Sequence, residues 1–262
     1  MRLALPVTAF QTEPRVTPSH HVWSFVKELL FVVVGAIVVS SLLRAFVGQM
    51  FIIPSESMES TLLKGDRVVV QKITDFHRGD VVVFEDPGGW LPDEPVAPPG
   101  PVDKVLEFIG VPTKSTPGHL IKRVIGMPGD KVVCCDDRGR ITVNGYAVDE
   151  TAYLYVNPDG SQVLASDVQF TVVVPKDRIF VMGDHRDLSR DSRCHLSESS
   201  TTQPRGYVAF VPEDLVVGPA FGIAAPFDRA KRLRDPATFA GVPPPKDPAP
   251  DNPTIEPAGV SC

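Results

Sequence analysis

One uninterrupted apolar run stands near the start of the chain. Residues 29–43 read LLFVVVGAIVVSSLL without a charged side chain, and flanking apolar residues extend the run to 23–47. A helix needs about 20 apolar residues to cross a bilayer, and Trp23 and Arg44 suit its two interfaces. The pattern predicts a transmembrane helix over 23–47 after a flexible tail at 1–22, but the sparse Lys and Arg residues on both flanks leave its orientation poorly determined. No small-x-small site follows the run directly, which favours an uncleaved signal anchor.

Beyond residue 48 the pattern changes to short, β-branched apolar runs separated by polar and glycine-containing turns. Many short strands with few long connections are typical of an antiparallel, partly barrel-like β domain. The expected fold class is therefore mainly β, with a single N-terminal transmembrane helix followed by a β domain over 48–228. Strands are expected at 67–70, 81–84, 121–125, 131–135, 140–143, 170–174, 179–182, 207–211 and 215–223.

Two segments depart from this strand pattern. Residues 86–119 contain DPGGW and EPVAPPGPV before a short apolar stretch at 102–109. We interpret them as an inserted excursion with one short amphipathic helix. From residue 229 the chain is charged and then proline-rich, with the sequence VPPPKDPAPDNP. This composition predicts a disordered tail over 229–262.

Charge and cysteine content narrow the function classes. The chain has 262 residues and a formal net charge of −6, which argues against a nucleic-acid partner. Its four cysteines are Cys134, Cys135, Cys194 and Cys262, and their spacing matches no zinc site. In an oxidising compartment Cys134 or Cys135 could pair with Cys194. Buried free thiols are the equal alternative.

Three polar segments carry candidate chemistry: PSESMESTL at 54–62, KRVIGMPGD at 122–130 and GDHRDLSRDSR at 183–193. A serine is a weak nucleophile and needs a base. A lysine is a base only when neutral, so apolar surroundings must lower its pKa from about 10.4. Lys122 has such neighbours, and on a strand Arg123 faces the other way, where it is wet or paired.

These segments, in this order after a membrane anchor, resemble the conserved boxes of type I signal peptidases. Gly79-Asp80-Val81-Val82 resembles the family's short strand box. The resemblance implies a membrane serine endopeptidase in which Ser57 is the nucleophile and Lys122 is the general base. It also implies that the Ser55 hydroxyl and the Ser57 N–H form the oxyanion hole.

The last segment supplies the supporting residues that the resemblance implies. Ser189 matches the serine that hydrogen-bonds and orients the lysine. Asp191 and Arg193 match residues that hold this wall of the site together through an ion pair. A solvated charge cluster is the structural alternative for these two residues.

The resemblance also implies a substrate and a location. The enzyme would remove signal peptides with small residues at −1 and −3 from exported secretory preproteins, on the outer face of the cytoplasmic membrane. This location implies that the tail at 1–22 is cytoplasmic and that the catalytic β domain at 48–228 is extracytoplasmic. The lipid membrane is the second expected partner, and no metal or cofactor is implied. Candidate walls of the substrate pocket are Ile53, Met58, Leu62 and Leu120, for which ordinary core packing is an equal alternative.

Three positions depart from the usual family pattern. Glu56 stands where glycine is usual, Ser60 where proline is usual and His185 where asparagine is usual. A charged side chain at Glu56 must point away from the cleft to leave the oxyanion hole intact. Neither Ser57 nor Lys122 is altered.

Other functions remain open at this stage. His185 or His195 with an aspartate could complete a Ser-His-Asp triad with Ser57. Asp184, Asp187 and Asp191 could bind a divalent cation, although they lack the EF-hand pattern. A self-cleaving repressor-type peptidase conflicts with the membrane segment. A non-catalytic, membrane-anchored binding protein of the export pathway is the alternative from another class.

Overall fold

The computed structural model describes residues 18–46, 48–92, 100, 103, 118–199, 203–233 and 237–256. The expected helix at 102–109 falls outside these residues, apart from position 103. So do residues 1–17 of the expected N-terminal tail.

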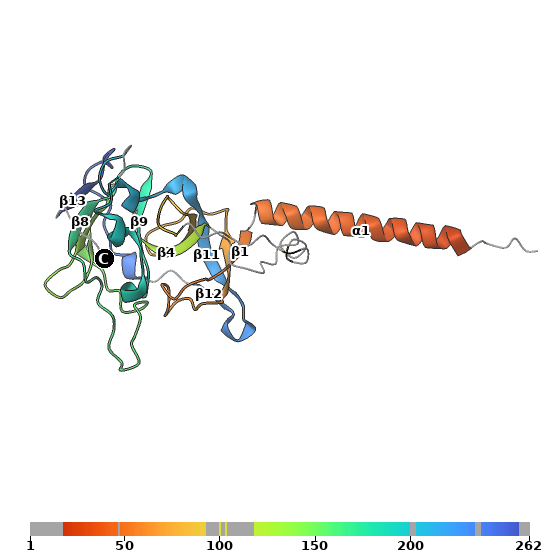
Figure 1. Ribbon diagram of the computed structural model, residues 1–262, viewed down its shortest axis with the longest axis horizontal. Coiled ribbons are helices and arrows are strands. Elements are labelled where there is room, and N and C mark those ends of the chain that lie inside the picture. Colours follow the sequence, from red (N-terminus) through yellow and green to blue (C-terminus); the bar gives the residue numbers. More distant parts are fainter. Residues whose placement is uncertain are drawn as a thin grey trace, which may run out of the picture.

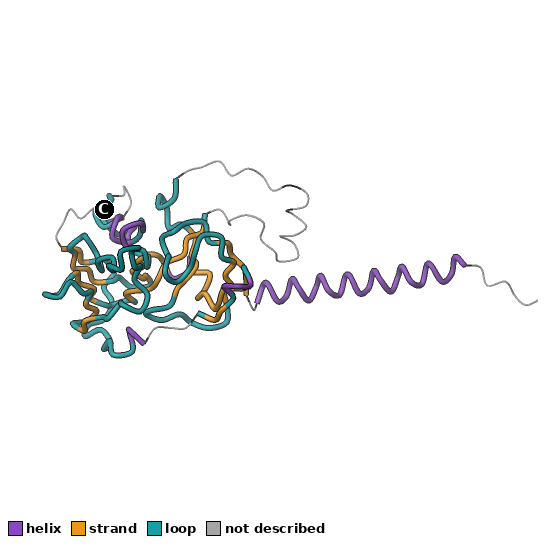
Figure 2. The backbone as a smooth tube through the Cα atoms, turned by 90° about the horizontal axis from the view of Figure 1, so that it is seen from below, coloured by secondary structure: helices purple, strands orange, loops and turns teal. Residues whose placement is uncertain are grey.

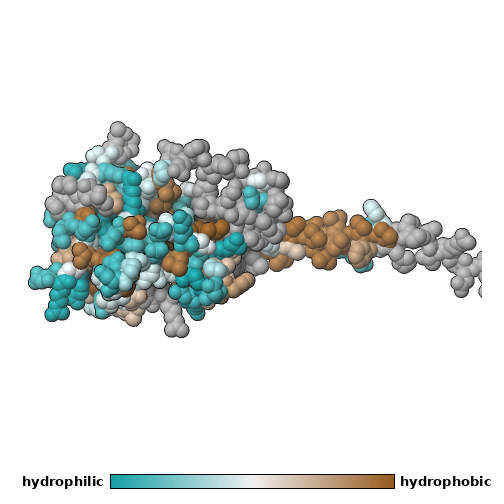
Figure 3. Space-filling model, turned by 60° about the horizontal axis from the view of Figure 1, so that its bottom comes forward, coloured by the Kyte–Doolittle hydropathy of each residue, from teal (hydrophilic) through white to brown (hydrophobic). Residues whose placement is uncertain are grey.

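One long helix projects from a β domain. Helix α1 spans Pro18–Phe46, so it begins five residues before the expected start of the apolar anchor. Its Val22–Ser41 stretch has a mean hydropathy of 2.2, is long and apolar enough to cross a membrane, and is not buried against the protein. Figures 1 and 3 show α1 extending away from the domain with an apolar surface. Such a surface fits a lipid environment, as the sequence predicts.

The larger sheet holds eight antiparallel strands. Their order is β1-β2-β11-β3-β4-β9-β10, with β12 paired to β11. No pairing joins β1 to β10 in the described part of the chain, so the sheet is open and only partly barrel-like. The fold class expected from the sequence is therefore confirmed. The strand bounds are β1 Gly48–Ile52, β2 Arg67–Gln71, β3 Val81–Glu85, β4 His119–Gly126, β9 Arg178–Met182, β10 Val211–Pro212, β11 Val216–Ala225 and β12 Lys231–Arg232.

A smaller sheet of five strands packs beside the first, in the order β13-β8-β5-β6-β7. Asn144 and Gly145 connect β6 to β7 with positive φ angles of 54° and 83°, as a tight hairpin turn requires. The strand bounds are β5 Lys131–Cys134, β6 Thr142–Val143, β7 Tyr146–Ala147, β8 Phe170–Val173 and β13 Thr254–Glu256. Figure 2 shows the strands of both sheets gathered at one end of α1.

Short 3₁₀ helices connect several of these strands. They are η1 Arg186–Leu188, η2 Ser192–His195, η3 Tyr207–Ala209, η4 Glu213–Leu215, η5 Phe227–Arg229 and η6 Ala237–Phe239. The expected strand at 207–211 is wrong over its first four residues. Gly206 adopts a φ of 70° and starts the η3 turn, so only Val211 of that run enters the sheet.

The C-terminal region also differs from its expected disorder. Strand β13 pairs with β8, and Figure 1 shows the two side by side. Phe239 is buried in the same core as the smaller sheet, and the Lys176 N–H donates to the Pro250 carbonyl. Residues 237–256 therefore form a packed strap on the domain. The disulfide bonding also differs from both expected alternatives. Cys134 is bonded to Cys135 and not to Cys194.

Candidate active site

Ser57 lies on a tight turn that follows β1. The Glu59 N–H donates to the Glu56 carbonyl at 3.0 Å, and the Leu62 N–H donates to the Met58 carbonyl at 2.8 Å. The Met58 and Leu62 side chains are fully buried in the core beneath. This anchoring fixes the turn, and it leaves the Ser57 side chain 4% exposed.

Lys122 reaches Ser57 from the central strand β4. Its Nζ lies 2.6 Å from the Ser57 Oγ, and its side chain is buried. Burial lowers the pKa of Lys122 from 10.5 to about 8, against the opposing charges of Asp191 and Asp184 and with a smaller contribution from Arg193. A hydroxyl beside an amine that loses its charge near neutral pH is equipped for nucleophilic chemistry.

Ser55 completes the polar edge of the cleft. Its Oγ lies 3.2 Å from the Ser57 Oγ, and its side chain is exposed. The Ser57 N–H donates to no acceptor among the described residues. The Ser55 hydroxyl and the Ser57 N–H therefore lie close together, and the oxyanion hole that the resemblance implies for them stays a prediction.

Ser189 packs against the same turn through Gly183. A Cβ atom at position 183 would lie 2.2 Å from the Ser189 Oγ and 2.5 Å from the Ser57 carbonyl oxygen. Only glycine permits this approach. Ser189 is buried, and its Oγ makes no well-aligned hydrogen bond in the described part of the chain, although it lies close enough to Asp191 to help lower the pKa of that carboxyl. The expected hydrogen bond to Lys122 is therefore not seen.

Asp191 and Arg193 form the ion pair that the sequence predicts. The Arg193 Nε donates to Asp191 Oδ1 at 2.9 Å, and both side chains are at most 1% exposed. Asp191 also accepts the Gly183 N–H at 3.0 Å. Burial acts to raise the pKa of Asp191, but the charge and hydrogen bonds of Arg193 outweigh it and lower the pKa. The carboxylate is thus held ionised beneath the Gly183–Ser189 contact.

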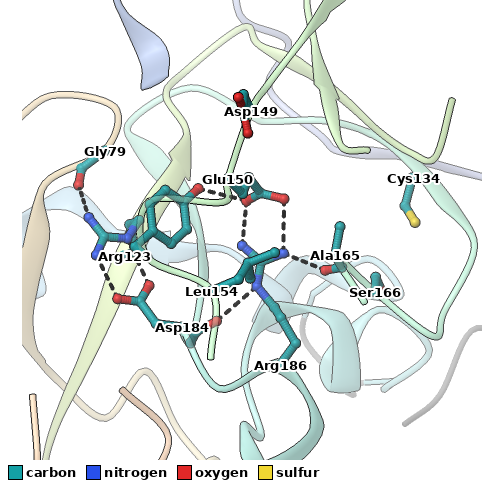
Figure 4. A network of polar contacts seen from close by, with 12 residues as sticks. Gly79, Arg123, Cys134, Asp149, Glu150, Leu154, Ala165, Ser166, Asp184 and Arg186 are labelled. Carbon is teal, nitrogen blue, oxygen red and sulfur yellow. Dashed lines mark hydrogen bonds and ion pairs between the residues drawn. The ribbon is translucent and has the colours of Figure 1, made fainter. Parts of the chain in front are cut away.

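Sequence reasoning missed a second ion pair, which holds β4 from behind. The Arg123 Nε donates to Asp184 Oδ1 at 2.7 Å, and its NH1 donates to the Gly79 carbonyl at 2.6 Å (Figure 4). Arg123 is buried, so both neighbours Lys122 and Arg123 are inaccessible to solvent. The Tyr153 ring covers the guanidinium with a centroid distance of 4.0 Å. The expected pairing of Arg123 is present, but its partner was not predicted.

A third buried pair joins Arg186 to Glu150, as Figure 4 shows. The Tyr153 hydroxyl donates to the same carboxylate at 2.7 Å. Burial, the charge of Glu150 and their hydrogen bond together raise the pKa of Tyr153, so the phenol stays protonated. The network links the loop at 150–155 to the segment that carries Ser189. The charged residues of GDHRDLSRDSR offered a signal for it, whereas Glu150 stands outside every motif.

Neither histidine forms the alternative Ser-His-Asp triad. His185 contacts Ser57 only through its backbone, whose N–H donates to the Ser57 carbonyl at 3.0 Å. The His195 ring stacks on Trp90 with a centroid distance of 4.4 Å, and its Nδ1 lies 2.8 Å from Glu198. Among the described residues the Ser57 hydroxyl therefore contacts Lys122 and no imidazole.

The candidate pocket residues divide into two groups. Ile53 and Leu120 line a shallow hollow of about 20 Å³ between the end of β1 and the start of β4. Met58 and Leu62 do not line it and instead pack in the core under the Ser57 turn. Ile53 also packs in that core, so the core alternative fits it together with Met58 and Leu62, and the partly buried Leu120 is the better candidate for substrate contact.

Comparison with known proteins gives a consistent family. The signal peptidase, peptidase S26 family matches residues 26–224. Signal peptidase I of Mycobacterium tuberculosis (strain ATCC 25618 / H37Rv) is 35% identical over 226 residues, which are 79% of this chain and 74% of that protein. Probable signal peptidase I of Mycobacterium leprae (strain TN) is 33% identical over 234 residues, 77% of each chain.

A solved structure adds little to this. The crystal structure of a signal peptidase I from Enterococcus faecalis V583 matches 56% of this chain and 97% of that chain, at 20% identity and a TM-score of 0.30. The sequence comparisons are decisive, because the family match spans most of the chain and the relatives exceed 30% identity over three quarters of their length. This chain belongs to the signal peptidase family, peptidase S26.

Proposed function

We propose that this chain is a membrane-anchored serine endopeptidase that removes signal peptides from secretory preproteins with a Ser57–Lys122 dyad. The observation that carries the proposal is the 2.6 Å contact between Lys122 Nζ and Ser57 Oγ in a buried site. The pKa of about 8 makes the amine available as a base near neutral pH.

The reaction follows from this contact. Ser57 Oγ attacks the scissile carbonyl carbon while neutral Lys122 takes the hydroxyl proton. The Ser55 hydroxyl and the Ser57 N–H donate to the oxyanion that forms. The intermediate collapses when the protonated Lys122 gives its proton to the leaving amine. This amine is the N-terminus of the mature protein, which leaves while the signal peptide stays bound to Ser57 as an ester. Water, deprotonated by Lys122, then hydrolyses the ester and releases the signal peptide, and Lys122 returns the proton to the Ser57 Oγ.

An extended substrate fits the edge of β4. Strand β3 pairs with positions 119–123 on one side of β4, whereas β9 pairs only from position 123 on the other side. Positions 120–122 thus have no strand paired on the β9 side in the described part of the chain, and a substrate strand can add there. The hollow lined by Ile53 and Leu120 has room for about 20 Å³, which suits a side chain as small as alanine. This supports small residues at −1 and −3.

The anchor places this site at the membrane. Helix α1 ends at Phe46, two residues before β1, so the cleft stays close to the lipid surface. Confinement to that plane raises the effective concentration of signal peptides. We place the β domain on the outer face of the cytoplasmic membrane, where translocated preproteins emerge.

The test uses the full chain in lipid or detergent with a secretory preprotein that has alanine at −1 and −3. The variants Ser57→Ala and Lys122→Ala are compared with matched controls, Ser60→Ala on the same turn and the exposed Lys176→Ala. We expect one cut, located by mass, that both site variants lose and both controls keep. Retention of that cut by Lys122→Ala would show that another group is the base.

A further inference from the structure

The turn that carries Ser57 is held by consecutive residues of one loop. The His185 N–H donates to the Ser57 carbonyl at 3.0 Å. The Thr61 hydroxyl donates to Asp184 on the same loop. A third contact joins side chains, because His185 Nδ1 lies 3.3 Å from the Glu59 carboxylate. The first two contacts join the Ser57 turn to positions 184 and 185, and the third has no assigned role.

The His185 ring is fixed in place but incompletely bonded. It stacks on Tyr155 with a centroid distance of 3.8 Å and an interplanar angle of 18°. The Tyr155 N–H donates to the Asp184 carbonyl at 3.2 Å, which ties the covering loop to this position. The His185 Nδ1 is buried and has no well-aligned hydrogen bond in the described part of the chain. Glu59, with a side chain 22% exposed, supplies the carboxylate beside it.

This pair fits a hydrogen bond that does not require a charged imidazole. A neutral imidazole with its proton on Nδ1 and an imidazolium both present an N–H to Glu59. A bond to a carboxylate is among the stronger ones, and it would satisfy a nitrogen that is costly to leave unpaired. The adjacent charges are engaged elsewhere, since Asp184 pairs with Arg123 and Arg186 pairs with Glu150.

We propose that Glu59 and His185 are a positioning pair, which holds the Ser57 turn against the 183–189 loop through a bond from His185 Nδ1 to the Glu59 carboxylate. The proposal rests on the proposed function. Neither side chain touches the reacting atoms, so both act through Ser57.

The reaction itself explains why such a pair is needed. While Ser57 Oγ contacts Lys122 Nζ, that contact helps to hold the turn. The contact is lost once Ser57 carries the acyl group, and the turn must then keep the ester within reach of the lysine-activated water. A displacement of about 1 Å costs roughly a hundredfold in rate. Contacts on the far side of the turn, such as Glu59 to His185, persist through both steps.

Four variants distinguish the effect of the His185–Glu59 hydrogen bond from the effect of ring stacking on Tyr155. Glu59→Ala removes the acceptor, and Glu59→Gln keeps one. His185→Phe keeps a ring to stack on Tyr155 but loses the N–H, whereas His185→Asn loses the ring and keeps an N–H near the position of Nδ1. Asp187→Asn, an exposed change in the same loop, is the control.

Cleavage kinetics are measured with the full chain in detergent and the alanine-bearing preprotein. We expect Glu59→Ala and His185→Phe to lower kcat by about three- to tenfold, as for loss of one partly buried charged contact, with KM within about twofold. Glu59→Gln and His185→Asn should recover most of kcat. The double variant Glu59→Ala/His185→Phe should be no slower than the worse single variant.

Deuterium exchange of the peptide that covers 56–62 gives a readout independent of catalysis. Exchange should rise in Glu59→Ala and His185→Phe and return to the wild-type rate in the two conservative variants. This result in a protein that does not cleave would refute the proposed function and support the pair. Wild-type cleavage with unchanged kcat in both disruptive variants would overturn the pair alone. So would a higher kcat in His185→Phe than in His185→Asn.

Discussion

The burial of Lys122 predicts that the proposed base destabilises the folded protein. Its pKa falls from 10.5 to about 8 because the folded state disfavours the charged amine. Between these two values the unfolded chain binds more protons than the folded chain, so stability rises with pH across that window. Below pH 8 the full penalty applies. Lys122→Met, which has a similar volume and no charge, should therefore be more stable than the wild type at pH 7.

The size of the effect follows from the same pKa values. The difference between 10.5 and 8, at about 1.4 kcal/mol per pH unit, corresponds to about 3.4 kcal/mol. The methionine loses the contact between Nζ and the Ser57 Oγ, which costs about 1 kcal/mol at any pH. The expected net gain is about 2–3 kcal/mol below pH 8. It should vanish at about pH 10 and become a loss of up to about 1 kcal/mol at higher pH, where the amine is neutral in both states. The variant should also be inactive.

Tryptophan fluorescence can follow this gain. The chain has two tryptophans, and only Trp90 is buried in the β domain. In a Trp23→Phe background, urea unfolding of the full chain in detergent would report on the domain alone. Midpoints are compared between the wild type and Lys122→Met at several values from pH 6.5 to 10.5, with the exposed Lys176→Met as control.

The pH dependence decides whether the reasoning holds. A gain that is the same at pH 7 and pH 10.5 would mean that better packing, and not removal of a buried charge, stabilises the variant. A variant less stable than the wild type at pH 7 would show that the penalty is absent. Either result would also remove the explanation for a lysine base near neutral pH.

Three further predictions concern the site and its support. The kcat/KM of cleavage should rise about tenfold per pH unit below pH 8 and level off above it, because only neutral Lys122 is a base. A pH–rate profile that continues to rise until about pH 10.5 would contradict this. Gly183→Ala should abolish cleavage in the same assay while most of the fold survives, since its Cβ would overlap the Ser189 Oγ. Phe239→Ala should destabilise the domain by about 3–5 kcal/mol in urea unfolding, because the ring is buried in the core and packs on Gly79, and an unchanged midpoint would show that the strap is dispensable.

The serine and lysine of the site could be predicted because the residues next to each of them in the sequence indicate its role. Ser57 follows a proline on a short polar turn, and Lys122 sits within an apolar strand. The alternation rule placed their neighbour Arg123 on the opposite face, and contacts from distant parts of the chain explain its burial there. Lys122 lies against Ser57, whereas Arg123 pairs with Asp184 under the Tyr153 ring, so neither residue reaches water.

The C-terminal strap could not be predicted from composition. A proline-rich segment has few donors and no apolar periodicity, which is also the signature of disorder. The strap is held instead by contacts that only the fold creates, such as the Asn144 side chain on the Pro243 carbonyl and the Pro245 ring above Gly129. These contacts join residues far apart in the sequence, so the local pattern of apolar and polar residues does not indicate them.

The protonation state of Lys122 depends on buried ion pairs that the sequence does not predict. Four cations are buried in the described part of the chain, and three of them have carboxylate partners: Arg123 with Asp184, Arg186 with Glu150 and Arg193 with Asp191. These partners lie 61, 36 and 2 residues apart along the chain, so no common spacing predicts them. The fourth cation, Lys122, contacts a hydroxyl instead. The arginines neutralise the nearby carboxylates, so burial has a larger effect on the pKa of Lys122 than the charges of Asp191 and Asp184 have. Lys122 can therefore lose its proton near neutral pH.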